Sequence, residues 1–430
     1  MDLSPNVDGR NAKALLDEGR LRQLFSTRSG DPPPLIAGRA HEQAVLSELL
    51  TDLADGRPGG LGAVLFGPRG NGKTVLLKDV ASKAQSEHEI DVVSFTPSMC
   101  PNTEALNAEL LRGVETPETV SRSMQGGLSA GLVKGQVTTT GTVRPSVPNT
   151  TSAVRERIQR TGKPLLVAVD EAHRLDRVVG EALLIAVQAS SGEALSAIAV
   201  LAGTPDLVDH IRRMNATFFL NRVGEGLLPM GLISDDEAVR AVAEPLRAAG
   251  LEVDLEAEHV IRESCAGYPY FTQLLGRAVA ESPGLTTGSP IPLGKEGDST
   301  CLETLNRFLE RKNRHYEGLW ADLRDARVIS CGYLLGKVQS ASPGGAMPDE
   351  QVEQAIDLGL ENPYEKTDHP PWYDEAKDRL KQLGLLWSPS ETTGASELGI
   401  PSFFDYLTAQ VRRLKPELAS QLDAALPLKG

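Results

Sequence analysis

Eight residues near the start of the chain have the types and the spacing needed to bind a phosphate chain. The stretch GPRGNGKT follows the apolar run LGAVLF and precedes the amphipathic run TVLLKDVASKA. In such a strand–loop–helix setting, loop N–H groups and the helix dipole hold phosphate, a lysine reaches the terminal phosphates and a threonine holds Mg²⁺. We therefore predict that nucleotide is bound by Gly67, Pro68, Arg69, Gly70, Asn71, Gly72, Lys73 and Thr74.

Two adjacent acids end a second apolar run. In PLLVAVDEAHRL, Asp170 and Glu171 follow residues 164–169, a pattern that predicts a buried strand. We predict that Asp170 organises Mg²⁺ and that Glu171 polarises the water that attacks a phosphate. The letters DEAH also occur in a class of helicases, but these need a second core domain, and none can be identified after residue 231. We therefore interpret His173 as an incidental residue of a helical first turn.

A third apolar run, AIAVLAGTP at 197–205, ends in Thr204, whose hydroxyl would lie at a strand end where it could sense a terminal phosphate. Between residues 35 and 230, such runs alternate with amphipathic segments of helical length, which predicts an α/β fold with a parallel sheet flanked by helices. The Gly-, Ser- and Thr-rich stretch 121–152 interrupts this alternation. It is compatible with an inserted β-hairpin and equally with a disordered surface insertion.

The chain around this core divides into shorter parts. Residues 1–34 are polar and end near GDPPPL, which predicts an N-terminal arm or linker before the core of residues 35–230. Three helical patterns over 231–283 predict a small helical lid. A Pro- and Gly-rich linker, 284–300, leads to residues 301–430, where helices precede LGLLW, a polar turn and LGIPSF. That order predicts a winged-helix-like domain.

Composition excludes several classes of protein. With 430 residues, of which 40% are apolar and 24% charged, the chain has the profile of a globular protein of two to three domains. No apolar run approaches the ~18 residues that cross a bilayer, and no secretory signal opens the sequence, so we expect a cytoplasmic protein without membrane contact. The four cysteines lack metal-binding spacing, and we expect them to be small buried residues.

The quoted motifs together resemble the AAA+ branch of P-loop ATPases across residues 35–280. The resemblance implies Mg²⁺-dependent ATP hydrolysis, with Gly67 to Thr74 as Walker A, Asp170 and Glu171 as Walker B, and Thr204 as sensor 1. LIAGRAHEQAVLSELL is similar to the box that lies against adenine in origin-recognition-type initiators and STAND ATPases. Gly38 and Arg39 match that box, whereas Ala40 replaces its usual acid.

The same resemblance implies an arginine finger and a nucleotide-sensing lid. Arg222 matches the finger position, from which it would act on a neighbouring subunit's nucleotide, and Arg212 and Arg213 are rivals for that role. The lid helix begins with Gly-Tyr-Pro, ending at Pro269. This start resembles STAND ATPases, where the proline packs near the base, and lacks the γ-phosphate arginine of the initiator group. Arg277, further along that helix, is a possible substitute, and Pro269 is also an ordinary first-turn residue.

Partners are less constrained than the reaction. We expect an ATP-bound homo-oligomer and a protein partner, because STAND proteins assemble when activated. Duplex DNA is the alternative, and YDEAKDRLKQLG at 373–384 would be the groove-reading helix. However, residues 301–430 contain 15 Lys and Arg against 20 Asp and Glu, a balance of −5, and the whole chain carries −14, whereas DNA readers are usually basic on their contact face. A scaffold whose ATP site is only structural is a third possibility.

Overall fold

The computed structural model describes most of the chain, in two compact units. The described residues are 16–26, 30, 32–57, 59–114, 149–191, 196–295, 297–342, 345–366, 369–389 and 394–427. One unit comprises residues 41–66 and 77–229, and the other comprises the chain up to residue 40 with 67–76 and 230 onward. The insertion predicted at 121–152 lies outside the described residues up to residue 148.

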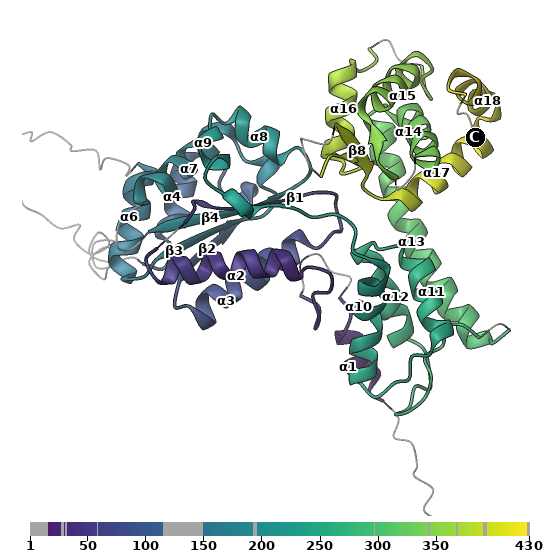
Figure 1. Ribbon diagram of the computed structural model, residues 1–430, viewed down its shortest axis with the longest axis horizontal. Coiled ribbons are helices and arrows are strands. Elements are labelled where there is room, and N and C mark those ends of the chain that lie inside the picture. Colours follow the sequence, from purple (N-terminus) through teal and green to yellow (C-terminus); the bar gives the residue numbers. More distant parts are fainter. Residues whose placement is uncertain are drawn as a thin grey trace, which may run out of the picture. The chain divides into compact units, whose positions relative to one another are not determined.

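A five-stranded parallel sheet forms the centre of the first unit (Figure 1). Its spatial order is β2-β3-β4-β1-β5, so β4 pairs with both β3 and β1. Strands β1, β3 and β4 are buried over their whole length, as expected for strands covered on both faces. The strands are β1 Gly62–Phe66, β2 Asp91–Phe95, β3 Leu165–Val169, β4 Ala197–Gly203 and β5 Leu227–Pro229.

Helices cover both faces of this sheet. Figure 1 shows α2 and α3 along one face and α4, α6 and α7 along the other. Side-chain caps begin several of them: Asn102 accepts from the Ala105 N–H, and Asp176 accepts from the N–H groups of Val178 and Val179. The α/β fold class predicted from the sequence is confirmed. The helices are α2 Ala40–Ala54, α3 Lys73–Glu87, η1 Pro97–Met99, α4 Thr103–Leu111, α6 Thr150–Thr161, η2 Ala172–Arg174, α7 Arg177–Ser190, α8 Leu207–Arg213, α9 Thr217–Leu220 and η3 Gly224–Gly226.

The second unit begins with a helical lid formed by α10 (Asp235–Ala248), α11 (Leu255–Cys265) and α12 (Pro269–Ala280). Part of the predicted N-terminal arm belongs to its core, because α1 (Glu18–Gln23) packs on α12 and the fully buried Phe25 fills the space beside Gly276. A mostly polar sequence pattern does not reveal such packing, which depends on the buried side chains of Leu21 and Phe25.

The segment predicted as a linker also packs on this lid. The N–H of Gly288 donates to the carbonyl of Gly250 at 2.7 Å, and Glu252 forms a parallel bridge with Pro290. Ile291 and Leu293 are buried in the same core. Residues 284–294 therefore stabilise the lid although they form no helix.

The C-terminal part combines helices with a small antiparallel sheet of order β6-β8-β7. The second hairpin strand lies earlier than LGIPSF suggested: Ala395–Leu398 pairs with β7, and Pro401 already occupies the first turn of α17. The elements are α13 Ser299–Asp325, α14 Ile329–Ala341, β6 Met347–Pro348, α15 Asp349–Glu361, α16 Tyr373–Gln382, β7 Leu386–Trp387, β8 Ala395–Leu398, α17 Pro401–Leu414 and α18 Pro416–Ala425.

Two further expectations concern the cysteines and the membrane. All four cysteines are free and buried, and burial raises the pKa of Cys265 and of Cys331 to about 12. They therefore behave as small apolar side chains, as predicted. Within the described residues, no helix combines the length and apolar character needed to span a bilayer.

Candidate active site

The glycine-rich loop Gly67–Thr74 follows β1 directly and leads into α3. Gly67 and Gly70 adopt φ values of +150° and +76°, which side chains rarely allow. A Cβ at Gly67 would also overlap the Met230 carbonyl, and one at Gly70 would overlap the Tyr268 hydroxyl. These two glycines therefore permit both the turn and the close approach of neighbouring groups.

Lys73 lies over this loop in the structure. Its ammonium donates to the carbonyls of Gly67 at 2.8 Å and Pro68 at 2.6 Å, and the side chain is 9% exposed. The fully buried Asn71 donates from its amide to the Met230 carbonyl at 3.1 Å, while its Oδ1 has no hydrogen-bond partner among the described residues. Backbone carbonyls of the loop thus hold the Lys73 ammonium in place.

The Gly38–Arg39 pair contacts the same loop. The buried Arg39 guanidinium donates to the carbonyls of Asn71, at 3.1 Å, and Gly231. Gly38 has φ +68° and donates its N–H to the Glu237 carboxylate at 2.8 Å. Arg39 therefore connects the loop to the chain entering the lid. A contact with adenine stays a prediction.

Tyr268 is a contact that sequence reasoning missed. Its hydroxyl donates to the Arg69 carbonyl of the loop at 2.9 Å, and its side chain is 1% exposed. Burial raises its pKa, so the hydroxyl stays protonated and remains a donor. The adjacent Pro269 occupies the first turn of α12. In the Gly-Tyr-Pro triplet, the tyrosine is thus the residue that contacts the loop.

Arg277, considered as a substitute γ-phosphate sensor, is occupied within the lid. Its guanidinium donates to the Glu281 carboxylate at 2.6 Å and to the Arg22 carbonyl at 2.6 Å. Arg311 donates to the same carboxylate. These contacts hold Arg277 on α1 and α12, so the structure gives no support to a phosphate-sensing role.

The C-terminal sheet region also contacts the loop within this unit. A Cβ at Gly384 would lie 2.8 Å from the Arg69 nitrogen, and one at Gly399 would lie 2.7 Å from Pro68. The Arg69 guanidinium also lies 3.7 Å from the Asp322 carboxylate on α13. The backbone at Gly384 and Gly399 therefore packs against Pro68 and Arg69. The Tyr268 hydroxyl contacts the Arg69 carbonyl as well.

The two predicted acids lie at the carboxyl end of β3. The Asp170 N–H donates to the Phe95 carbonyl, which keeps Asp170 in line with the sheet, and its Oδ1 accepts from the Glu171 N–H at 2.9 Å. Glu171 adopts φ +54°, a strained value for a residue with a side chain, and its side chain is 47% exposed. Strain of this kind is typical of functional sites.

Thr204 lies at the end of β4, the neighbour of β3, but its hydroxyl differs from the prediction. The hydroxyl is buried and donates to the Asp206 carboxylate at 2.5 Å. The Thr204 N–H instead donates to His173 Nδ1 at 3.3 Å, and His173 Nε2 lies 3.5 Å from the Glu171 carboxylate. His173 is therefore not incidental, because it lies between two predicted site residues.

Arg222 lies at the opposite edge of the sheet. Its carbonyl accepts from the Leu61 N–H just before β1, whereas the loop starts just after β1, and five strand residues span about 17 Å. Its exposed guanidinium has no hydrogen-bond or ionic partner among the described residues, whereas Arg212 pairs with Asp209 and Arg213 lies 3.8 Å from Asp206. Within its own unit, Arg222 therefore lies by the amino end of β1 with an exposed guanidinium, and the finger role stays a prediction.

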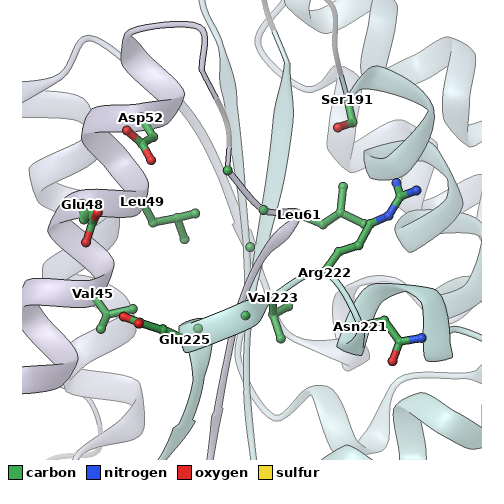
Figure 2. A pocket seen from close by; sticks show the side chains of 15 residues that line it. Val45, Glu48, Leu49, Asp52, Leu61, Ser191, Asn221, Arg222, Val223 and Glu225 are labelled. Carbon is green, nitrogen blue, oxygen red and sulfur yellow. The ribbon is translucent and has the colours of Figure 1, made fainter.

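A cavity of about 600 Å³ lies beside Arg222 at this amino edge (Figure 2). Glu48 and Asp52 of α2 line it together with Glu225. Figure 2 shows the Arg222 side chain extending away from the two acids of α2. The residues that line the cavity include none from the glycine-rich loop.

The donor set fits a nucleotide accompanied by Mg²⁺. Among the described residues, no cluster of three or more His, Cys, Asp or Glu side chains could form a metal cage. Mg²⁺ at phosphate sites is usually held by one or two protein oxygens, phosphate oxygens and waters. The half-buried Asp170 carboxylate and the Thr74 hydroxyl would supply such oxygens.

Within the first unit, the parallel sheet places Asp170 and Thr204 at one edge. Strands β3 and β4 are neighbours, and Asp170 and Thr204 follow their carboxyl ends, while the glycine-rich loop follows β1 along the chain. Ligands of open parallel sheets bind at that edge. One unit contains the loop, Arg39 and Tyr268. The other unit contains Asp170, Glu171, His173 and Thr204.

Comparison with known proteins agrees with this arrangement. Residues 35–202 match the family model described as an AAA ATPase domain. No curated protein matches the sequence. Among solved structures, the Walker-type ATPase PABY2304 of Pyrococcus abyssi is 17% identical with a TM-score of 0.55, covering 89% of this chain and 99% of that one.

Two archaeal proteins match more distantly. Cdc6p of Pyrobaculum aerophilum is 11% identical with a TM-score of 0.42, covering 95% of this chain and 99% of its own. The ORC1 protein of Aeropyrum pernix, solved in complex with DNA, is 12% identical with a TM-score of 0.43, covering 90% and 95%. The geometry and the family model lead to one conclusion: residues 35–202 match an AAA ATPase domain and contain its P-loop, which supports ATPase activity.

Proposed function

We propose that this protein is a Mg²⁺-dependent, STAND-like switch in which the bound nucleotide controls the arrangement of lid and C-terminal domain. The observation that carries the proposal is the hydrogen bond from the Tyr268 hydroxyl to the Arg69 carbonyl. Because Pro269 directly follows Tyr268 at the start of α12, a shift of the loop would be transmitted to the lid helix. The contacts of Gly384 and Gly399 with the same two loop residues support an extension of this coupling to the C-terminal domain.

In this proposal the predicted residues have separate roles. Gly67–Thr74 and Arg39 hold the nucleotide, while Asp170 and Thr74 supply protein oxygens for Mg²⁺. Glu171 accepts a hydrogen bond from the attacking water, whose oxygen bonds to the γ-phosphorus as the bond to the β–γ bridging oxygen breaks and its electron pair stays on ADP. Arg222 would neutralise the developing charge from a neighbouring subunit, which makes an ATP-bound homo-oligomer part of the proposal.

We propose a winged-helix fold for the C-terminal domain. The order α14, β6, α15, α16, β7 and β8, with a sheet of order β6-β8-β7, supports it. Helix α16 carries Asp374, Glu375 and Asp378 against Lys377, Arg379 and Lys381. Its lack of net positive charge favours a protein partner over a nucleic-acid groove for this helix.

Intrinsic fluorescence tests the switch. Trp387 on β7 is 4% exposed and packs on Gly231, where an added Cβ would lie 2.9 Å from its ring. Replacing Trp320 and Trp372 by phenylalanine leaves Trp387 as the only tryptophan, which is excited selectively at wavelengths that tyrosine does not absorb, and Glu171→Gln slows turnover. We expect emission to shift to longer wavelength with ATP relative to ADP as Trp387 becomes exposed. Identical spectra with ATP, with ADP and without nucleotide would contradict the proposal, and Lys73→Ala provides the control without a response.

One observation favours DNA as a second candidate partner. A cavity of about 180 Å³ in the C-terminal domain is lined by Arg324, Arg327 and Lys366, against a single acid, Glu365, which pairs with Arg324. Arg327 holds φ +62° at the end of α13, where glycine is usual. The adjacent start of α14 has no side-chain cap, so its dipole adds positive potential.

Binding of a fluorescent duplex at two salt concentrations tests this alternative. If DNA phosphates occupy the basic cavity, Arg327→Ala with Lys366→Ala weakens binding by about tenfold and reduces its salt dependence. The matched control is Lys377→Ala on α16, which leaves that binding intact. Absence of ATP-dependent duplex binding by the unmodified protein would remove this candidate.

A further inference from the structure

We infer that His173 is a positioning residue that orients the Glu171 carboxylate by reference to the backbone at the end of β4. The inference rests on the role proposed for Glu171. It concerns a connection between the ends of β3 and β4, in which neither the glycine-rich loop nor the lid takes part. Three contacts of the ring carry the argument.

The first contact fixes the protonation of the ring. The Thr204 N–H donates to His173 Nδ1 at 3.3 Å, so Nδ1 must carry a lone pair. A neutral imidazole that accepts at Nδ1 carries its proton on Nε2.

The second contact gives that proton a direction. Nε2 lies 3.5 Å from the Glu171 carboxylate, so the partial positive charge of the Nε2–H group lies close to that carboxylate. The His173 side chain is 7% exposed, whereas the Glu171 side chain is 47% exposed. A buried ring therefore restrains a carboxylate that solvent alone would leave free to rotate.

The third contact explains how the ring can lie so close to β4. Gly203 is the last residue of β4, and a Cβ there would lie 3.2 Å from both the His173 backbone nitrogen and its Nδ1. Any larger residue would push the ring away by a few tenths of an ångström. Glu171 itself holds a left-handed backbone that places its side chain next to the turn carrying His173.

The chemical consequence concerns rate and not binding. Misplacing a catalytic group by about 1 Å can cost about 100-fold in rate. Nothing in these contacts touches the glycine-rich loop, so nucleotide affinity should be independent of His173. Because Thr204 supplies the N–H, a displacement of the β4 end would be transmitted to Glu171 through the ring.

A double-mutant cycle on the full-length protein tests the inference. We expect His173→Ala to lower the single-turnover rate of ATP hydrolysis by about 10- to 100-fold, with the Kd for ATP unchanged. His173→Gln should recover part of the loss, because its amide can donate from nearly the same place as Nε2. In the Glu171→Gln background, His173→Ala should change the residual rate by less than about twofold, since the two residues act as a unit. Arg174→Ala, an exposed neighbour in the same turn, is the matched control.

The contradicting results are distinct. If His173→Ala and Glu171→Gln reduce the rate additively, or if His173→Ala weakens ATP binding as much as hydrolysis, the positioning role is wrong while the role of Glu171 stands. If Glu171→Gln alone leaves hydrolysis unchanged, both proposals fail. Should His173→Ala not fold, Gly203→Ala replaces it in the cycle, and it must reproduce the rate loss with normal ATP affinity.

Discussion

The two halves of the candidate site are built from different chemical groups. The glycine-rich loop is organised by backbone atoms: Lys73 donates to two carbonyls, Arg39 to two more, and the Tyr268 hydroxyl to another. The acidic half is organised by side chains, with Glu171 and His173 arranged around the Thr204 N–H. This difference predicts a division of labour in which the loop determines binding and the strand ends determine rate.

A large effect should come from a residue outside both halves. Arg222→Ala should lower turnover by about 10³-fold without changing ATP affinity, because an arginine finger acts only on transition-state charge. Steady-state hydrolysis and equilibrium ATP binding measure the two quantities. Arg212→Ala, already paired with Asp209, is the control and should leave turnover unchanged.

A mixing experiment makes the same assignment without relying on one variant. Lys73→Ala subunits lack a working loop but carry Arg222, and Arg222→Ala subunits have the converse defect. Mixed at equal amounts, they should recover about one quarter of normal activity if subunits assemble head to tail at random. Recovery of no activity, with both variants folded and assembled, would assign Arg222 to another role.

The next largest effect belongs to the loop half. Lys73→Ala removes the ammonium predicted to reach the terminal phosphates, and ATP affinity should fall by about 10- to 100-fold, as expected for loss of charged hydrogen bonds. Isothermal titration with ATP measures it. Lys78→Ala, an exposed lysine on the same helix, should bind ATP normally. A Lys73→Ala protein with intact affinity and reduced rate would break the division between the two halves.

The smallest effect concerns the coupling of the loop to the lid. Tyr268→Phe removes one hydrogen bond and leaves the Arg69 carbonyl without it, at a cost of about 1 kcal/mol in the free energy of unfolding. ATP affinity should change little, but the nucleotide-dependent emission of Trp387 should be lost. Tyr270→Phe, the half-buried neighbour on α12, is the matched control. A normal Trp387 response in Tyr268→Phe would show that the lid is coupled to the loop by other contacts.

Sequence reasoning succeeded where the pattern is local. The run of buried residues before Asp170 and the strand–loop–helix context of Lys73 each lie within about a dozen residues, and the α/β sheet that they predicted is confirmed. Glycine at Gly67 and Gly70 was recognisable because the loop conformation requires it.

The contacts that sequence reasoning missed are those between distant segments. Tyr268 reaches a carbonyl 199 residues earlier, and the Thr204 N–H reaches a ring 31 residues earlier. No periodicity records such pairs, because only the assembled sheet and lid bring them together. The same holds for Leu21 and Phe25, apolar residues of a mostly polar segment that become part of the lid core. His173 was visible in the DEAH motif, but the motif did not show that its ring accepts from the Thr204 N–H.

The most direct measurement of the division of labour is a comparison of ATP binding and single-turnover hydrolysis in Glu171→Gln and the unmodified protein. The substitution preserves the size of the side chain and removes the charge that polarises water. We predict an unchanged Kd for ATP and a hydrolysis rate lowered by about 10²- to 10⁴-fold. An unchanged rate, or an equal loss of binding and hydrolysis, would contradict the account.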